Sequence, residues 1–425
     1  MEKEIRKTLL HDWHVAQGAN MASFGGYDMP LWYPRGAKKE HLAVLTHAGI
    51  FDTSHMAAIL VTGAGAADIL QQCFTKDLGA CIGKSRTPLT PGRCVYGAYL
   101  NERGEVIDDA IVSQIEANLY MVVVNAGMGR VIADHMAAQK NHQDADITDM
   151  TDKLGKLDIQ GPMSAKILAK VLENPEVVLC DMEYFTFRGF FDPGSPLSDT
   201  VRLSDGIPVL LSRTGYTGEL GFEIFVHPDK FVALWEMLLD VGKDLGLTPC
   251  GLAARDSLRA GAMLPLSHQD IGAWPFVNHP WEFALPYTLD KSGFTKKFIG
   301  DNALRNTAES EHTLAFAGYD LRKIPVSDQA YVADASGNKI GRILTCVSDM
   351  GIGCHENRIY SIASPDKPEN FTPKGLCCGF VRVGEKLPPG EIVELRDARR
   401  KIKVMIVDDI RPDRTARKKV SGVKC

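Results

Sequence analysis

The spacing of apolar residues changes near residue 310, and this change limits the fold more than any other feature of the sequence. Before it, helix-like and strand-like segments follow one another in irregular order. After it, the helical patterns stop, and short strands alternate with glycine and proline turns such as Pro388-Pro389-Gly390. We therefore predict an α+β fold for residues 1–310, rather than a regular parallel βαβ series, and a separate antiparallel β-barrel domain for residues 311–425.

The first region is expected to hold all of the longer helices. Helices are predicted over residues 34–48, 66–73, 127–139, 163–173, 229–245 and 250–263. Strands are predicted over residues 57–61, 154–159, 182–189, 207–213 and 221–226, with a meander of three strands between Arg93 and Val124. These assignments put a pair of aspartates on a strand, a glycine-rich segment on a loop and a pair of arginines on a helix.

The composition excludes several classes of protein. The chain has 425 residues, 45% of them hydrophobic, so it can bury large cores and extended disorder is excluded. Its net charge of −5 leads us to expect no nucleic-acid partner and no membrane partner. The basic segment from Arg411 to Lys424 is predicted to be a solvated end of the chain. A charged N-terminus and the lack of any apolar stretch near ~20 residues predict a cytoplasmic protein.

The common cofactor and metal motifs do not occur in the sequence. The ten cysteines include no C-x-x-C pair, and the adjacent Cys377 and Cys378 have a poor geometry for sharing one zinc ion, so no metal is expected. The segment from Val61 to Asp68 contains G-x-G, but Asp68 replaces the third glycine of a dinucleotide fingerprint. A tight turn into a helix explains that segment better than a nucleotide site.

Two adjacent carboxylates, Asp108 and Asp109, lie in an otherwise apolar strand. Side chains alternate faces along a strand, so we predict that the two point in opposite directions and do not form a dyad that shares one proton. Aspartate is disfavoured in strands, and a pair of them calls for an explanation. One carboxylate could enter a half-buried cleft; the alternative is a surface aspartate beside a turn-capping one.

A glycine-rich segment from Ser212 to Glu223 is the densest candidate for a binding loop. Its glycines at 215, 218 and 221 allow the backbone to approach a ligand closely or to turn sharply, and they surround Tyr216 and two glutamates. The alternative is a glycine-rich hairpin without a ligand.

Two arginines, Arg255 and Arg259, are four residues apart on the helix predicted after Pro249 and therefore share a face. The planar guanidinium group suits the recognition of carboxylates. The alternative is a pair of surface arginines, one of them bridged locally to Asp256.

Taken together, these segments resemble the aminomethyltransferase (T-protein) family of the glycine cleavage system. Five motifs occur in the family's order: residues 8–30, which end in Gly25-Gly26-Tyr27-Asp28-Met29-Pro30, and then residues 49–56, 104–109, 215–223 and 251–256. The resemblance implies a three-domain arrangement around a central folate pocket. In that arrangement residues 1–310 form two interleaved α+β subdomains and residues 311–425 form the third domain.

The resemblance also implies roles for individual residues. Asp108 matches the family's catalytic carboxylate, beside the folate amine that receives the carbon. The positions that match residues lining the folate pocket are Met56, Asn125, Tyr216, Glu223 and Arg255. Tetrahydrofolate is the implied co-substrate, no metal is implied, and the implied partner is the lipoylated H-protein that carries the aminomethyl group.

The sequence departs from the family pattern between Ala260 and Trp281. The family's usual Tyr-Gly is replaced by Ser267-His268, and an aromatic stretch from Trp274 to Trp281 follows. These positions lie on the donor side by analogy with the family, so a small methylated compound is an alternative carbon donor. Trp274 and Trp281 could then form an aromatic wall for a cationic donor, or they could simply pack in a core.

A third alternative is a folate-binding assembly factor without catalysis. Relatives of that kind carry the motif K-G-C-Y-x-G-Q-E, which is absent from this sequence.

Overall fold

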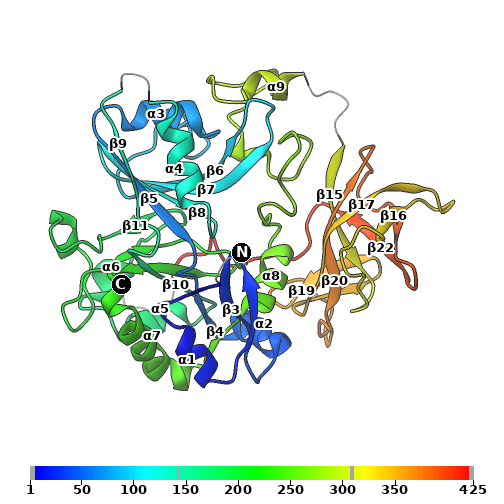
Figure 1. The fold of residues 1–425 in the computed structure, drawn as a ribbon. Helices are drawn as coiled ribbons and strands as arrows, with labels where there is room; N and C mark the ends of the chain where they lie inside the picture. The colour runs from blue at the N-terminus through cyan, green and yellow to red at the C-terminus, as the bar shows by residue number, and fades with distance from the viewer. Residues whose placement is uncertain (1–4, 141–142, 307–310, 421–425) are drawn as a thin grey trace.

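Figure 1 shows the computed structural model of the chain, which describes residues 5–140, 143–306 and 311–420. A six-stranded sheet lies at the centre of its lower half, in the order β11-β12-β13-β10-β4-β14. Its strands are β4 (Ala48–Asp52), β10 (Gly155–Gln160), β11 (Phe187–Arg188), β12 (Leu210–Ser212), β13 (Gly221–Val226) and β14 (Leu247–Pro249). The apolar core of this part includes Phe222 of β13 and Trp235 of the covering helix α7 (Pro228–Gly242).

A five-stranded antiparallel sheet forms the second layer, in the order β6-β7-β8-β5-β9. Its strands are β5 (Ala57–Thr62), β6 (Arg93–Leu100), β7 (Val106–Glu116), β8 (Leu119–Val124) and β9 (Asp146–Asp149). The meander predicted between Arg93 and Val124 is therefore confirmed. The chain enters this sheet after β4 and returns to the six-stranded sheet at β10, so the two sheets alternate along the sequence.

The remaining helices and a small sheet complete this region. The small sheet consists of β1 (Arg6–Lys7), β3 (Tyr27–Trp32) and β2 (Asn20–Phe24). The α-helices are α1 (His11–Ala16), α2 (Ala37–Thr46), α3 (Ala66–Cys73), α4 (Gly129–Ala137), α5 (Ser164–Leu168), α6 (Pro175–Leu179), α8 (Leu252–Gly261) and α9 (Asp301–Arg305). Short 3-10 helices occupy Pro196–Asp199, Lys243–Leu245 and Glu282–Ala284.

A closed antiparallel barrel follows, as the sequence predicts. Around the barrel the strands are β15 (His312–Gly318), β20 (Leu376–Val383), β17 (Lys339–Asp349), β16 (Tyr331–Ala333), β21 (Ile392–Arg396) and β22 (Lys401–Val407). A hairpin of β18 (Ile352–His355) and β19 (Arg358–Ser361) projects from it. Pairing of β15 with β22 closes the barrel and leaves no open edge between these two strands.

Three predicted elements are much shorter than expected. The strand predicted over residues 207–213 is limited to β12. The strand predicted over residues 182–189 is limited to β11, because Phe185 (φ 64°) and Gly189 (φ 75°) adopt left-handed conformations that interrupt an extended chain. The helix predicted over residues 163–173 ends at Leu168 as α5.

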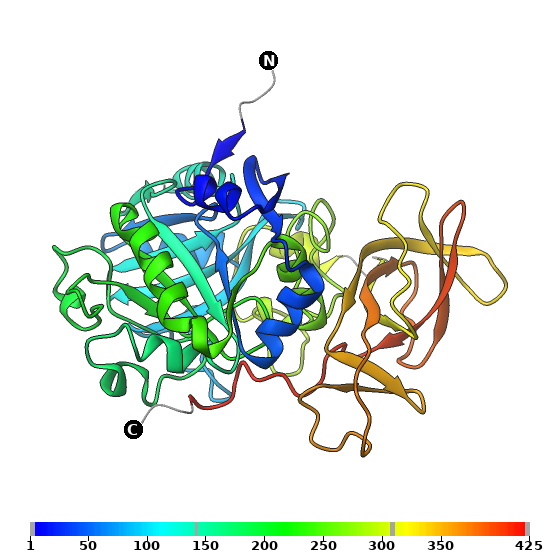
Figure 2. The same cartoon turned by 90° about the horizontal axis from the view of Figure 1, so that it is seen from below.

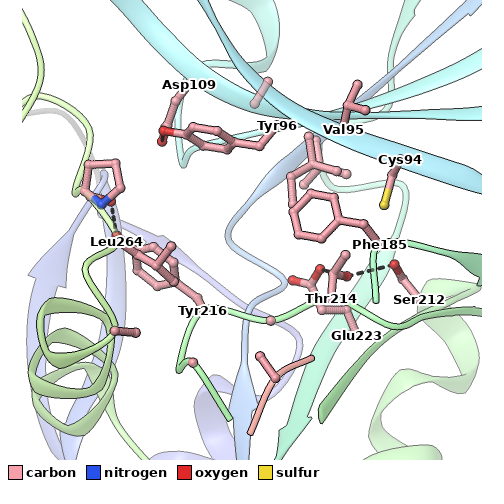
Figure 3. Close-up of a pocket in the computed structure, with 18 of the residues that line it drawn as sticks. Cys94, Val95, Tyr96, Asp109, Phe185, Ser212, Thr214, Tyr216, Glu223 and Leu264 are labelled. Atoms are coloured by element: carbon pink, nitrogen blue, oxygen red, sulfur yellow. Dashed lines mark hydrogen bonds between the residues drawn. The ribbon is translucent and has the colours of Figure 1, made fainter. Parts of the chain in front are cut away.

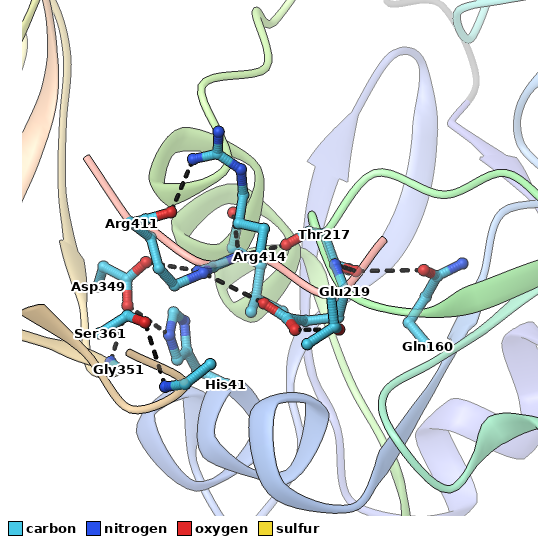
Figure 4. Close-up of polar contacts among 12 residues, drawn as sticks. His41, Gln160, Thr217, Glu219, Asp349, Gly351, Ser361, Arg411 and Arg414 are labelled. Atoms are coloured by element: carbon cyan, nitrogen blue, oxygen red, sulfur yellow. Dashed lines mark hydrogen bonds and ion pairs between the residues drawn. The ribbon is translucent and has the colours of Figure 1, made fainter. Parts of the chain in front are cut away.

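The start of the segment after the barrel contradicts the prediction of a solvated end from Arg411 to Lys424, of which residues 421–424 lie outside the described residues. In Figure 2 it runs back beneath the rest of the molecule, away from the barrel. The side chain of Arg411 is 1% exposed and forms ion pairs with Asp349 of β17 and Glu219. Its guanidinium group also donates to the backbone oxygen of Thr217 (Figure 4). Charge spacing along the sequence could not reveal this, because the carboxylates that bind Arg411 lie about 60 and 190 residues away.

Candidate active site

A cavity of about 1190 Å³ lies where the two large sheets, helix α8 and the C-terminal segment meet. Figure 3 shows Asp109 and Tyr96 on the side of the five-stranded sheet, with Tyr216, Thr214 and Glu223 opposite them. All five positions assigned to the folate pocket by resemblance line this cavity, namely Met56, Asn125, Tyr216, Glu223 and Arg255. Residues that are distant in the sequence therefore converge on one site.

The carboxylate pair on β7 differs from the sequence prediction in which residue faces the cavity. Asp109 lines the cavity, and its carboxylate accepts a hydrogen bond from the Tyr96 hydroxyl at 2.8 Å. Asp108, to which the sequence analysis assigned the catalytic role, is 0% exposed and is not among the cavity-lining residues. Its oxygens accept hydrogen bonds from the Ser267 hydroxyl at 2.8 Å and from the Asn125 backbone N–H at 2.9 Å.

The two carboxylates lie on different sides of β7, as alternation predicts, but Asn125 links them, which alternation does not predict. The side-chain amide of Asn125 donates to Asp108 at 2.7 Å and to Asp109 at 2.7 Å. Strand β8 ends at Val124, opposite Ala110, so Asp108 and Asp109 have no partner strand on the β8 side of β7, although β6 still pairs with both on the other side. Asn125 reaches around this end of the sheet and joins both side chains, which alternation along β7 alone does not predict.

Burial raises the pKa of both carboxyl groups above the ordinary value of 3.8. For Asp109, the negative charge of Asp108 raises the pKa further. The hydrogen bonds from Asn125 and Ser267 favour the ionised form of Asp108 but do not outweigh its burial. The pair therefore retains a proton at a pH where exposed carboxyl groups are ionised.

The raised pKa values predict how stability depends on pH. The folded protein keeps protons on this pair that the unfolded chain releases above about pH 4. The pair therefore loses stabilising free energy as the pH rises, up to the folded pKa of Asp109 at about 7. We expect Asp109→Asn to raise the melting temperature relative to wild type more at pH 8 than at pH 4.5, by about 1 °C per kcal/mol of relieved charge burial in a chain of 425 residues.

Differential scanning calorimetry at the two pH values measures this effect. The matched control is Asp134→Asn on helix α4, where the carboxylate is 60% exposed. Its melting temperature should change between pH 4.5 and pH 8 by as much as that of wild type. The contrary result is a melting temperature of Asp109→Asn that lies further below that of wild type at pH 8 than at pH 4.5. It would show that the surroundings stabilise the ionised form of Asp109.

A network of buried charges forms the opposite wall. Glu223 of β13 accepts a hydrogen bond from Lys156 of β10 at 2.5 Å and another from Thr214. Lys156, whose side chain is 4% exposed, also binds Asp158 at 2.8 Å. Burial opposes the ionisation of Asp158, but the positive charges of Lys156 and Arg255 outweigh it and hold its pKa below the usual range. The network therefore keeps a carboxylate, Glu223, at the cavity surface in a fixed position.

The sequence suggests that Arg255 of helix α8 recognises a ligand carboxylate. In the structure its guanidinium group already has partners within the protein. Its guanidinium group donates to Asp158 at 2.7 Å, and it lies over the ring of Tyr216, 4.9 Å from the ring centroid. The stacked pair presents a flat surface at the cavity wall. Flat aromatic ligands bind well to such surfaces.

The glycines of the segment from Ser212 to Glu223 are explained by packing and by a turn. A Cβ atom at Gly215 would lie 2.2 Å from the side-chain oxygen of Gln160, so a side chain there would displace this buried amide from its hydrogen bonds to the backbone oxygens of Thr214 and Phe222. Gly218 has φ 76°, and a side chain there would collide with Ala262 and Arg414. The glycines thus place Tyr216 and Glu223 at the cavity by allowing the loop to lie flat against β10.

The segment between Ala260 and Trp281 divides into two parts. Residues 262–269 line the cavity, whereas Trp274 and Trp281 do not. Trp281 is 0% exposed and donates to the backbone oxygen of Met263 at 2.8 Å. The guanidinium groups of Arg342 and Arg382, which are cross-strand neighbours in the barrel, lie 5.2 and 4.8 Å from the ring centroid of Trp274. The interpretation of these two tryptophans as a donor-binding wall is wrong, and their alternative role in packing is correct.

Several site residues were missed by the sequence analysis. Lys156 and Asp158 are charged residues two apart in a strand whose six positions are all buried, and that pattern could have identified them. The cavity-lining residues of the C-terminal segment, such as Arg414 and Arg417, carry no comparable signal.

The described part of the chain holds neither a candidate metal cluster nor a helix able to cross a membrane. Within residues 5–140, 143–306 and 311–420, no group of three or more His, Cys, Asp or Glu side chains is placed to hold a metal ion. Over the same ranges, no helix has the length and apolar character needed to cross a bilayer.

Known proteins resemble the chain over most of its length. The family model described as the GCVT N-terminal domain matches residues 10–288. An aminomethyltransferase of Streptomyces coelicolor is 36% identical over 357 residues, which cover 82% of this chain and 87% of that protein. One from Halothermothrix orenii is 33% identical over 394 residues, covering 92% and 95%. The crystal structure of glycine cleavage system aminomethyltransferase T from Bartonella henselae covers 98% of this chain and 100% of its own, with a TM-score of 0.73 and 25% identity.

Proposed function

The chain belongs to the aminomethyltransferase (T-protein) family of the glycine cleavage system, and on this premise we propose that it transfers an aminomethyl carbon from lipoylated H-protein to tetrahydrofolate. The products are methylenetetrahydrofolate, ammonia and the dihydrolipoyl protein. Membership of this family makes the chain an enzyme, a one-carbon transferase. We further propose a cytoplasmic location and a reaction that needs no metal.

The observation that carries the proposal is the placement of two carboxylates, Asp109 and Glu223, on opposite walls of one cavity. The amino-pyrimidine edge of a pterin presents N–H donors, which the fixed Glu223 carboxylate can accept. The pterin ring is flat and suits the surface formed by Tyr216 and Arg255. Asp109 then stands beside the folate amine, where it accepts a proton or stabilises positive charge during transfer.

We expect Glu223→Gln to weaken tetrahydrofolate binding about tenfold to a hundredfold, because a hydrogen bond to a charged acceptor is worth about 1.5–3 kcal/mol. Titration calorimetry measures the affinity, and EDTA should leave it unchanged. The control is Glu236→Gln, at an exposed position of helix α7, which should bind as wild type does. No saturable binding to wild type at millimolar tetrahydrofolate would refute the proposed function.

The identity of the carbon donor is tested separately from the binding of tetrahydrofolate. Trp274 and Trp281 lie outside the cavity, so they do not form the aromatic wall that a small cationic donor would need. Wild-type protein should form methylenetetrahydrofolate from aminomethyl-loaded H-protein, and should not form a one-carbon folate from small methylated amines or sulfonium compounds. Turnover with a small donor alone would replace our proposal by the folate-dependent demethylase.

A further inference from the structure

His268 is held at the apex of a turn beside the buried carboxylate pair. Its side chain lines the cavity and is 53% exposed, and its Nε2 atom lies 3.8 Å from an oxygen of Asp108. The residue adopts φ 63°, a left-handed conformation that histidine adopts more often than most other non-glycine residues.

The turn that carries His268 is anchored on both sides. Asp270 is fully buried, accepts hydrogen bonds from Arg259 of α8 and from Thr345 of β17, and also accepts from the backbone N–H of Leu266 at 3.0 Å. Ser267 binds Asp108 directly at 2.8 Å. Three elements of the fold, α8, β17 and β7, therefore fix the turn that carries the imidazole.

The carboxylate pair needs a route to solvent once the cavity is occupied. Asp109 faces the cavity, so a bound folate covers it, and Asp108 has no exposed surface of its own. His268 is the half-exposed titratable group next to Asp108. The other titratable groups lining the cavity near the pair are Tyr96, Tyr216 and Arg255, and the hydroxyl hydrogens of the two tyrosines are engaged by Asp109 and by the backbone oxygen of Pro265.

We propose that His268 carries protons between the Asp108–Asp109 pair and solvent during turnover. The proposal rests on the function proposed above. In that reaction two N–H bonds of tetrahydrofolate break, and the two protons end on the leaving ammonia and on the dihydrolipoyl sulfur. A proton taken up by the pair is passed to His268 Nε2, and the imidazole releases it to water at the cavity mouth, from which the leaving groups are protonated. Imidazole is the side chain suited to this exchange near neutral pH.

The test uses two variants that respect the left-handed backbone, His268→Asn and His268→Gly. Asparagine and glycine both tolerate this conformation, so the turn should keep its shape. We expect kcat to fall about a hundredfold in both, with the dissociation constant of tetrahydrofolate changed less than twofold. Added imidazole should restore turnover in His268→Gly in proportion to its concentration and should not affect wild type. The control is His355→Asn, at an exposed position of strand β18 in the barrel hairpin.

The outcomes separate this inference from the proposed function. If wild type is active and both His268 variants are fully active, the proposed role of His268 is overturned and the proposed function is not. A loss of kcat that imidazole does not restore also overturns it, because it indicates a steric or donor-binding role. Inactive wild type refutes the function, and the relay with it. A double variant, His268→Asn with Asp108→Asn, should be no slower than the slower single variant, because both act on one path.

Discussion

Asp109→Asn should lower kcat by about a hundredfold to ten-thousandfold, the usual range for a positioned acid or base. The carboxylate lies at the cavity surface, held by Tyr96 and Asn125, where it faces the bound substrate. Asparagine has nearly the same shape but neither accepts a proton nor carries charge. Because the lost interaction belongs to the transition state, tetrahydrofolate affinity should change only slightly. Steady-state kinetics together with titration calorimetry measure both quantities.

The comparison with Asp108→Asn decides between the two assignments. Asp108 is buried behind Asp109, so we expect its replacement to lower kcat less, through the position and charge of its neighbour. If Asp108→Asn were the more damaging change, the assignment from the sequence resemblance would be right and the cavity-facing geometry would be misleading. Asp134→Asn again serves as the exposed control.

Arg411→Met should reduce the free energy of unfolding by about 3–5 kcal/mol, the cost of leaving buried partners of an ion pair uncompensated. The variant leaves Asp349, which is 0% exposed, and Glu219 without their cation. It also removes donors to the backbone oxygens of Thr217 and Leu258, which connect the C-terminal segment to the active-site loop and to helix α8. Urea unfolding followed by fluorescence measures the loss.

The matched control is Arg399→Met, at an exposed position in the turn before β22, where we expect a change within about 0.5 kcal/mol. A loss below about 1 kcal/mol in Arg411→Met would mean that the C-terminal segment is held no more firmly than a surface ion pair would hold it. The tetrahydrofolate affinity of the folded fraction is a second readout, because Tyr216 is adjacent to Thr217 in the same loop.

Local sequence patterns predicted most of the elements, and the family resemblance predicted five residues that line the cavity. The meander from Arg93 to Val124 and strand β13 follow from short-range alternation of apolar residues, which survives in any tertiary context that buries one face. The barrel follows from many short strands separated by turns. Met56, Tyr216, Glu223 and Arg255 lie in motifs that the resemblance covers, and the resemblance also assigns Asn125 to the pocket; all five line the cavity.

Only the tertiary structure decided which carboxylate faces the cavity and what holds it. Alternation assigns Asp108 and Asp109 to opposite faces but does not say which face is buried, and it cannot foresee that Asn125 reaches both around the end of β8. The same limit applies to the C-terminal segment and to Trp274, whose partners come from distant elements. Periodicity records the neighbours of a residue along one strand or helix. Pairing of charges across elements depends on distances that no local pattern contains, and it is this pairing that sets the position, the burial and the pKa of the groups at the site.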